Sequence, residues 1–296
     1  MSRAARTPPT SRPTAWWLAA LERRATRMHE YGAPEQPLEG ASDVERRAAI
    51  KFFNAAFRAE ESGIHQAHEL AGSVQSWDPE LAEVLRLYGN EEGWHRELLT
   101  EFLAALGGQV EPMGRVTRTL YKVYARAKRM DTIVLSNLMF ETIGSTTYRL
   151  ALGNVRDPAA RRMLTILTRD EAFHVPLNVH FLRRVLEREP GGLPRLRRLY
   201  WLLFCSLVLL PLASRPKAQA FDGIATRDLM RAYALELGRL FAREHDLDLA
   251  PPRLLLRLLG ISPRELTRGA ALSPTSVEAA ELAVDREQVV VTAGTS

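Results

Sequence analysis

The chain has 296 residues, of which 46% are hydrophobic and 25% charged. These proportions are ordinary for a globular protein and exclude wholesale disorder. The single cysteine, Cys205, excludes an internal disulfide, a Cys-x-x-Cys redox pair and cysteine-ligated zinc or iron-sulfur sites, so we expect a reducing, cytoplasmic environment. The net charge of +5, from 40 basic and 35 acidic residues, is too small to indicate nucleic-acid binding.

Turn signals divide most of the chain into segments with a helical pattern. Within these segments apolar residues recur at spacings of three and four, and no alternating pattern with hairpin turns suggests a sheet. Asp78-Pro79 and Asp157-Pro158 are typical helix starts, because aspartate caps the first turn and proline fits its first position. The sequence therefore predicts an all-α fold with four long helices, at 44–71, 79–106, 116–153 and 157–189.

The chain is expected to divide into four regions. The longest apolar run, Leu199 to Ala213, has fifteen residues, fewer than the roughly 20 that cross a bilayer. This run predicts an ordinary buried helix, or else a helix that lies in a membrane interface or covers a lipid-binding pocket. The predicted regions are an N-terminal tail with a short helix (1–40), a four-helix bundle (41–190), a helical C-terminal extension (191–272) and a C-terminal tail with little helical periodicity (273–296).

Two of the four long helices carry the same short motif. Glu92-Gly-Trp-His95 lies in the second helix and Glu171-Ala-Phe-His174 in the fourth. In each motif the glutamate and the histidine fall on the apolar stripe of the helix. Both acids and both imidazoles are therefore expected to point into the core.

Each of the two partner helices also has a glutamate on its apolar face. In the third helix this residue is Glu141, and in the first it is Glu60. Glu60 is preferred to its neighbour Glu61 because it lies opposite the polar face of the helix, but the sequence leaves both open. His68 is an additional candidate ligand on the first helix.

Four carboxylates cannot be buried in such a core without compensation. Each uncompensated charge costs several kcal/mol, whereas the net stability of a domain is roughly 5 to 15 kcal/mol. Four-helix bundles bind two metal ions through one glutamate from each of two helices and a Glu-x-x-His pair from each of the others. The four glutamates and two histidines of this chain match that ligand set.

The pattern resembles the ferritin-like di-iron carboxylate superfamily. The segment Arg169-Asp170-Glu171-Ala172-Phe173-His174 is particularly similar to the corresponding segment of ribonucleotide reductase small subunits. The resemblance covers residues 44–189 and implies a ferritin-like bundle with two iron ions, with a manganese-iron pair as the alternative. It implies that Glu60 and His95 bind one metal, that Glu141 and His174 bind the other, and that Glu92 and Glu171 bridge the two.

An acidic residue precedes each motif glutamate. These residues are Glu91 and Asp170, and metal-bound histidines commonly donate their second N–H to such a group. In similar family members the acid before one motif orients the histidine of the other. The resemblance thus implies that Asp170 contacts His95 and that Glu91 contacts His174, with a solvated position on the helix surface as the alternative for both acids.

Within this superfamily the sequence favours some activities over others. Leu99 stands where radical-generating reductase subunits have a tyrosine, and Leu167 where arylamine oxygenases have a third histidine. The remaining implication is an oxygenase or oxidoreductase that uses O2 to hydroxylate, desaturate or otherwise oxidise a hydrophobic small molecule or lipid. Ser145, one turn after Glu141, would assist proton delivery in that activity, or else it is a small residue for helix packing.

Two other activities stay open at this point. One is a ferroxidase or an oxygen- or peroxide-scavenging protein, and the other is a tRNA-modifying di-iron hydroxylase. No glycine-rich nucleotide-binding motif is present, so electrons are expected from a separate reductase. We also expect a cytoplasmic protein, with a homodimer and peripheral contact to the inner face of the membrane as further expectations.

Overall fold

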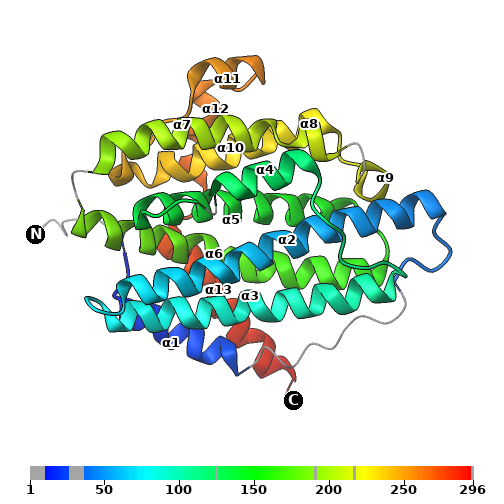
Figure 1. Cartoon of the computed structure of the whole chain (residues 1–296), viewed down its shortest axis with the longest axis horizontal. Helices are drawn as coiled ribbons and strands as arrows, with labels where there is room; N and C mark the ends of the chain where they lie inside the picture. Colours follow the sequence, from blue (N-terminus) through cyan, green and yellow to red (C-terminus); the bar gives the residue numbers. More distant parts are fainter. Residues whose placement is uncertain (1–10, 27–36, 125, 190–191, 216–217, 295–296) are drawn as a thin grey trace, which may run out of the picture.

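A four-helix bundle forms the centre of the molecule. The computed structural model describes residues 11–26, 37–124, 126–189, 192–215 and 218–294, and all regular structure in these ranges is helical. Helix α2 packs along α3 and α5 packs along α6 (Figure 1). The predicted all-α fold with a four-helix bundle is confirmed for the part of the chain that the structure describes. The four helices are α2 (Asp43–Val74), α3 (Pro79–Ala105), α5 (Met130–Asn154) and α6 (Pro158–Arg188).

Side-chain caps fix where three bundle helices begin. Ser42 and Glu45 form a reciprocal capping box at the start of α2. The Asp78 carboxylate accepts a hydrogen bond from the backbone N–H of Leu81, and Asp157 accepts one from Ala160. The two Asp-Pro starts predicted from the sequence are therefore confirmed.

The predicted helix over 116–153 is wrong, because this stretch contains two helices. Helix α4 (Arg115–Tyr124) ends before a basic segment, and α5 begins at Met130 after the extended Arg129. The start of α5 is held by the Asp131 carboxylate, which is buried and paired with Arg129 and Arg195. These tertiary ion pairs favour a new helix start over continuation through Arg126, Lys128 and Arg129.

Helices at both ends of the chain cover the bundle. Helix α1 (Thr14–Ala25) packs against α3. The predicted C-terminal tail at 273–296 is wrong, since α13 (Ser276–Gly294) packs against α6. Its contact face consists of small residues, so its helical periodicity is weak in the sequence. Among the described side chains of α13, the buried ones are Ser276, Val277, Ala280, Ala283 and Val284.

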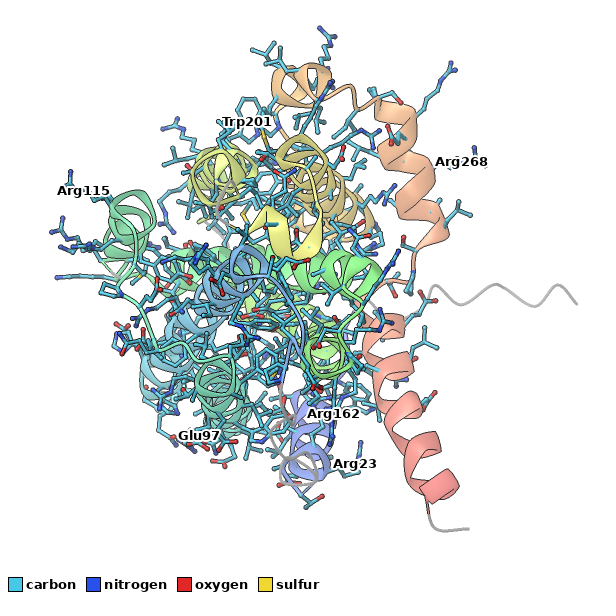
Figure 2. All side chains as sticks on the ribbon, turned by 90° about the vertical axis from the view of Figure 1, so that its right-hand side faces the viewer. Arg23, Glu97, Arg115, Arg162, Trp201 and Arg268 are labelled. Atoms are coloured by element: carbon cyan, nitrogen blue, oxygen red, sulfur yellow. The ribbon has the colours of Figure 1, made fainter. Side chains whose placement is uncertain are left out.

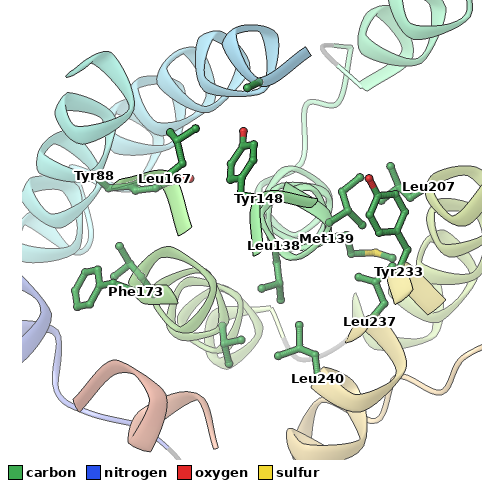
Figure 3. Packing of buried hydrophobic residues seen from close by; sticks show 14 of the residues in the cluster. Tyr88, Leu138, Met139, Tyr148, Leu167, Phe173, Leu207, Tyr233, Leu237 and Leu240 are labelled. Carbon is green, nitrogen blue, oxygen red and sulfur yellow. The ribbon is translucent and has the colours of Figure 1, made fainter. Parts of the chain in front are cut away.

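The C-terminal extension is helical and shares one core with the bundle. Helix α7 packs against α5 and α10, and Figure 3 shows side chains of the bundle and of the extension on opposite sides of α5. Leu193–Ser214 is long and apolar enough, by length and composition alone, to cross a membrane. The helices are α7 (Leu193–Leu209), α8 (Pro211–Ser214), α9 (Gln219–Asp222), α10 (Thr226–Arg243), η4 (His245–Leu247), α11 (Arg253–Leu258) and α12 (Pro263–Leu272).

Candidate metal centre

The six predicted ligands meet in the interior of the bundle. Each of the four bundle helices contributes, and every one of the six side chains is buried. Three overlapping groups have ligand atoms that all lie within 4.8 Å of one another. The groups are Glu92 with His95 and His174, Glu60 with His95 and Glu171, and Glu141 with Glu171 and His174.

The two histidines present the same ring nitrogen to this cluster. Nδ1 of His95 lies 3.3 Å from Oε2 of Glu60, and Nδ1 of His174 lies 3.0 Å from Oε1 of Glu92 and 3.8 Å from Oε2 of Glu171. Their Nε2 atoms point the opposite way, toward other acids. Nδ1 is therefore the nitrogen that each histidine offers to a metal ion.

The two outer acids pair with the histidines across the bundle. Nε2 of His95 lies 3.0 Å from the Asp170 carboxylate, and Nε2 of His174 lies 2.8 Å from the Glu91 carboxylate. The contacts expected for both acids are thus present, each linking α3 to α6. Such partners fix the orientation of a ligating imidazole and raise its basicity.

The structure distinguishes Glu60 from Glu61. Glu60 is 2% exposed and contacts His95, whereas Glu61 forms an ion pair with Arg58 at 2.6 Å near the surface. His68 is exposed and lies outside the cluster. The position of Glu60 therefore fits its predicted role as the ligand from the first bundle helix. The positions of Glu61 and His68 do not fit a role as metal ligands.

Several buried atoms in the cluster make no well-aligned hydrogen bond, although Nδ1 of His174 lies 3.0 Å from Oε1 of Glu92. Among the described residues, these include Oε1 of Glu92, Oε2 of Glu171 and Nδ1 of His174. Gly63, one turn after Glu60, leaves room for the Glu92 carboxylate, because a Cβ at that position would lie 3.0 Å from Oε2 of Glu92. Buried polar atoms are normally paired, so these atoms fit two divalent cations at this centre.

The pKa shifts of the two bridging candidates also indicate that their carboxylates need positive charge nearby. Burial, together with the negative charges of Glu60 and Glu141, raises the pKa of Glu92 well above its ordinary value. Burial and the adjacent Glu141 do the same to the pKa of Glu171. Without metal, the surroundings therefore favour the protonated form of both bridging candidates.

For two other acids of the site, Glu60 and Asp170, the surroundings favour the ionised form. Burial opposes ionisation of Glu60, but hydrogen bonds with Glu92 and His95 outweigh it and lower the pKa of Glu60 to about 2. For Asp170, the charge of Arg24 and the hydrogen bond from His95 outweigh burial, so that its pKa lies far below the usual range. Asp170 and Glu60 in turn raise the pKa of His95 to about 10 against the effect of burial.

Arg24 is a functional candidate that was not predicted from the sequence. It lies on α1, is 6% exposed, and its guanidinium donates to Glu91 at 2.7 Å and to Asp170 at 3.0 Å. Arg24 is thus the cation shared by both acids that orient the histidines, and Asp170 also accepts from Arg169 at 2.8 Å. A signal was present, because Trp17, Ala20, Leu21 and Arg24 follow the spacing of one helical face.

Two tyrosines hold metal-site carboxylates from the other side. The Tyr88 hydroxyl donates to Oε1 of Glu141 at 2.7 Å, and the Tyr148 hydroxyl donates to Oε1 of Glu60 at 3.0 Å. The Asn137 amide donates to the Tyr88 oxygen at 3.1 Å. Burial, together with the neighbouring carboxylates, raises the pKa of both tyrosines well above 10, so that both remain hydrogen-bond donors.

A pocket adjoins the carboxylates on the side of α4. Its space between atoms, including solvent at its mouth, is about 350 Å³. Ser145 is half-buried on α5 and is not among the lining residues, so its role in proton delivery stays a prediction. The lining residues are Ala59, Glu60, Ser62, Glu92, Tyr121, Tyr124, Asn137, Phe140, Glu141, Gly144, Tyr148 and Glu171.

Comparison with known proteins agrees with this geometry. Residues 51–177 match the rubrerythrin family model, and this region contains all six predicted ligands and both outer acids. The match spans 127 of the 296 residues, less than half of the chain, and makes this region similar to the rubrerythrin family. A mutant of an R2-like ligand-binding oxidase with an aerobically reconstituted Mn/Fe cofactor is similar in structure, with a TM-score of 0.47 and 10% sequence identity over 94% of each chain. No curated protein gives a significant match.

Metal binding should release protons from this centre. The raised pKa values of Glu92, Glu171 and His95 favour their protonated forms, and each must lose its proton to act as a ligand. The apparent affinity for Mn(II) should therefore rise from about pH 6 to about pH 8. Calorimetric titration in two buffers with different ionisation enthalpies measures the release, and equal heats in both buffers would contradict it.

The bridging assignment predicts a change in metal stoichiometry. Native protein should bind two metal ions per chain, and Glu92→Ala or Glu171→Ala should bind at most one, because each removes a ligand shared by both ions. Glu61→Ala is the matched control and should keep two. Elemental analysis of folded, desalted protein measures the ratio, and two ions in either bridging variant would refute the assignment.

Arg24 should support metal affinity although it does not contact the ligands directly. Arg24→Ala leaves Glu91 and Asp170 without their shared cation, and loss of such support costs about tenfold or more in affinity. Arg23→Ala, an exposed neighbour on the same helix, should bind normally (Figure 2). Competition with a chelator gives the affinities. If both variants bound metal with native affinity, Arg24 would be a packing residue only.

Proposed function

We propose that this protein is a di-iron oxidoreductase that activates O2 and oxidises a hydrophobic small molecule or lipid. The observation that carries the proposal is a buried cluster of four carboxylates and two imidazoles beside a pocket with aromatic walls. Glu60 and His95 would bind one ion, Glu141 and His174 the other, and Glu92 and Glu171 would bridge. When bound, two ferrous ions supply the electrons and the Lewis acidity for O2 activation.

The ligand chemistry supports iron or manganese in this site. Carboxylate and imidazole donors suit divalent iron and manganese, whereas thiolate sites favour softer ions or iron-sulfur clusters. The predicted ligands include no thiolate, since Cys205 lies far along the chain on α7. A manganese-iron pair has the same donor requirements and is the alternative metal content.

The pocket supports an apolar substrate in preference to an ion. Tyr121, Tyr124 and Phe140 form its aromatic wall opposite the carboxylates. Burial and nearby acids raise the pKa of Tyr121 and Tyr124 above that of free tyrosine, which keeps both hydroxyls neutral. A neutral aromatic wall binds hydrocarbon by burial of apolar surface and does not attract cations by charge.

The chain's own residues prepare the site for chemistry. Asp170 and Glu91 hold the two imidazoles with Nδ1 facing the cluster, and Tyr88 and Tyr148 each hold one carboxylate oxygen. These contacts preorganise the ligands before any ion binds, and burial excludes bulk water from them. Electrons are proposed to come from a separate reductase.

A second candidate is a ferroxidase or peroxide-scavenging protein. The match to the rubrerythrin family model favours this alternative. It differs from the first proposal in its substrate, because it needs only iron, oxygen or peroxide and no organic molecule. The same buried ligand set would serve either reaction.

An oxygen pulse tests for an O2-activating centre. Protein loaded anaerobically with two equivalents of ferrous iron should give a transient visible absorption band when mixed with O2, and Glu92→Ala should not. If native protein with two bound ions showed no optical change, the proposal would be contradicted.

A comparison of two reactions separates the candidates. Reduced protein should consume O2 faster when a fatty acid or similar apolar compound is added, and an oxidised product should form. Rapid turnover of hydrogen peroxide without dependence on any apolar compound would establish the scavenging function instead.

A further inference from the structure

One edge of the molecule exposes a set of large apolar side chains. Helices α7, α8 and α11 form this edge, and Trp201 lies beside α11 (Figures 1 and 2). Large apolar side chains that gather on adjoining exposed helices commonly mark a binding surface. The exposed residues are Trp201 (54%), Leu202 (65%), Leu209 (41%), Leu212 (59%), Leu254 (71%) and Leu258 (71%), which we call the docking surface.

The leucines of α7 and α8 follow a regular helical spacing. Alternating steps of four and three residues place one set of side chains on the same face of the helix. The members of this set are Arg198, Leu202, Cys205, Leu209 and Leu212. The opposite face of α7 is buried against α5 and α10. Because one face is used for packing in the protein, this helix can lie along a membrane but cannot cross it in this fold.

Hydrogen bonds join α7 to the segment that leads into α11. The Trp201 indole N–H donates to the carbonyl of Ala250 at 2.8 Å, and Nε of Arg197 donates to the carbonyl of Asp248 at 3.2 Å. Leu254 and Leu258 follow within one turn of each other on α11. The two parts of the docking surface are therefore held together.

Basic side chains outnumber acidic ones around the docking surface, although Arg195, Arg197 and Arg215 are already paired with Asp131, Asp248 and Asp222. Residues 190–221 contain five basic residues and no aspartate or glutamate, and residues 249–264 contain three arginines and again no acid. Arg198, Arg253 and Arg257 are exposed. A symmetric dimer through this surface would bring these arginines close to their own copies, which is unfavourable.

We propose that the docking surface binds the interface of an anionic lipid bilayer. The leucines would insert among the acyl chains near the headgroups, Trp201 would lie at headgroup depth, and the arginines would contact lipid phosphates. This arrangement is that of an interfacial helix with apolar and basic groups on its exposed side. The inference does not depend on the metal centre or on the substrate proposed above.

Vesicle flotation of the metal-loaded, full-length protein tests the proposal. The protein should float with vesicles that contain phosphatidylglycerol, and much less with phosphatidylcholine alone. Leu202→Glu/Leu258→Glu should lose about tenfold or more in affinity, since burial of each leucine stabilises the bound state. Leu282→Glu, which changes an equally apolar exposed residue of α13, is the matched control and should bind normally.

The arginines and the salt dependence provide a second measurement. Arg253→Gln/Arg257→Gln should weaken binding to anionic vesicles by about fivefold for each arginine, and added salt should weaken binding of the native protein. Failure of native protein to float with anionic vesicles would overturn the proposal. A native dimer in solution that Leu202→Glu/Leu258→Glu converts to monomers would also overturn it, by assigning the surface to a second copy of the chain.

Discussion

Negative charge inside an apolar helical bundle must be balanced by positive charge at short range. Here the acids form two groups that are balanced differently. Glu91 and Asp170 are satisfied by the protein itself, through Arg24 and the Nε2 atoms of the two histidines. The inner carboxylates retain unpaired oxygens on Glu92 and Glu171. The protein neutralises the outer group and leaves the inner group for cations.

This division follows from the helical positions of neighbouring acids. Consecutive residues on a helix point about 100° apart, so the acid before each motif glutamate cannot face the same centre. Glu91 therefore reaches His174 on α6, and Asp170 reaches His95 on α3. The two contacts are reciprocal and hold α3 and α6 at a fixed separation. A single substitution among these residues would disturb both halves of the site.

The helices outside the bundle complete the centre and extend the molecule in different directions. Helix α1 contributes Arg24, and α4 contributes the two tyrosines of the aromatic wall. Helix α7 packs against α5, which carries Glu141. The docking surface lies on the outer face of α7 and α8 and on the adjoining α11. The inner face of α7 is part of the core that it shares with the bundle. One continuous core thus supports a buried polar site and an exposed apolar edge.

The sequence by itself determined three of the four long bundle helices and the two Glu-x-x-His motifs. Periodicity, Asp-Pro starts and two Glu-x-x-His motifs depend on residues close together in the chain, where spacing specifies direction on a helix. Tertiary structure decided what spacing cannot specify: the break before α5, the packing of α13, the selection of Glu60 over Glu61, and Arg24 between two acids far away in sequence. These features depend on contacts between segments, whose energies appear only when the chain is folded.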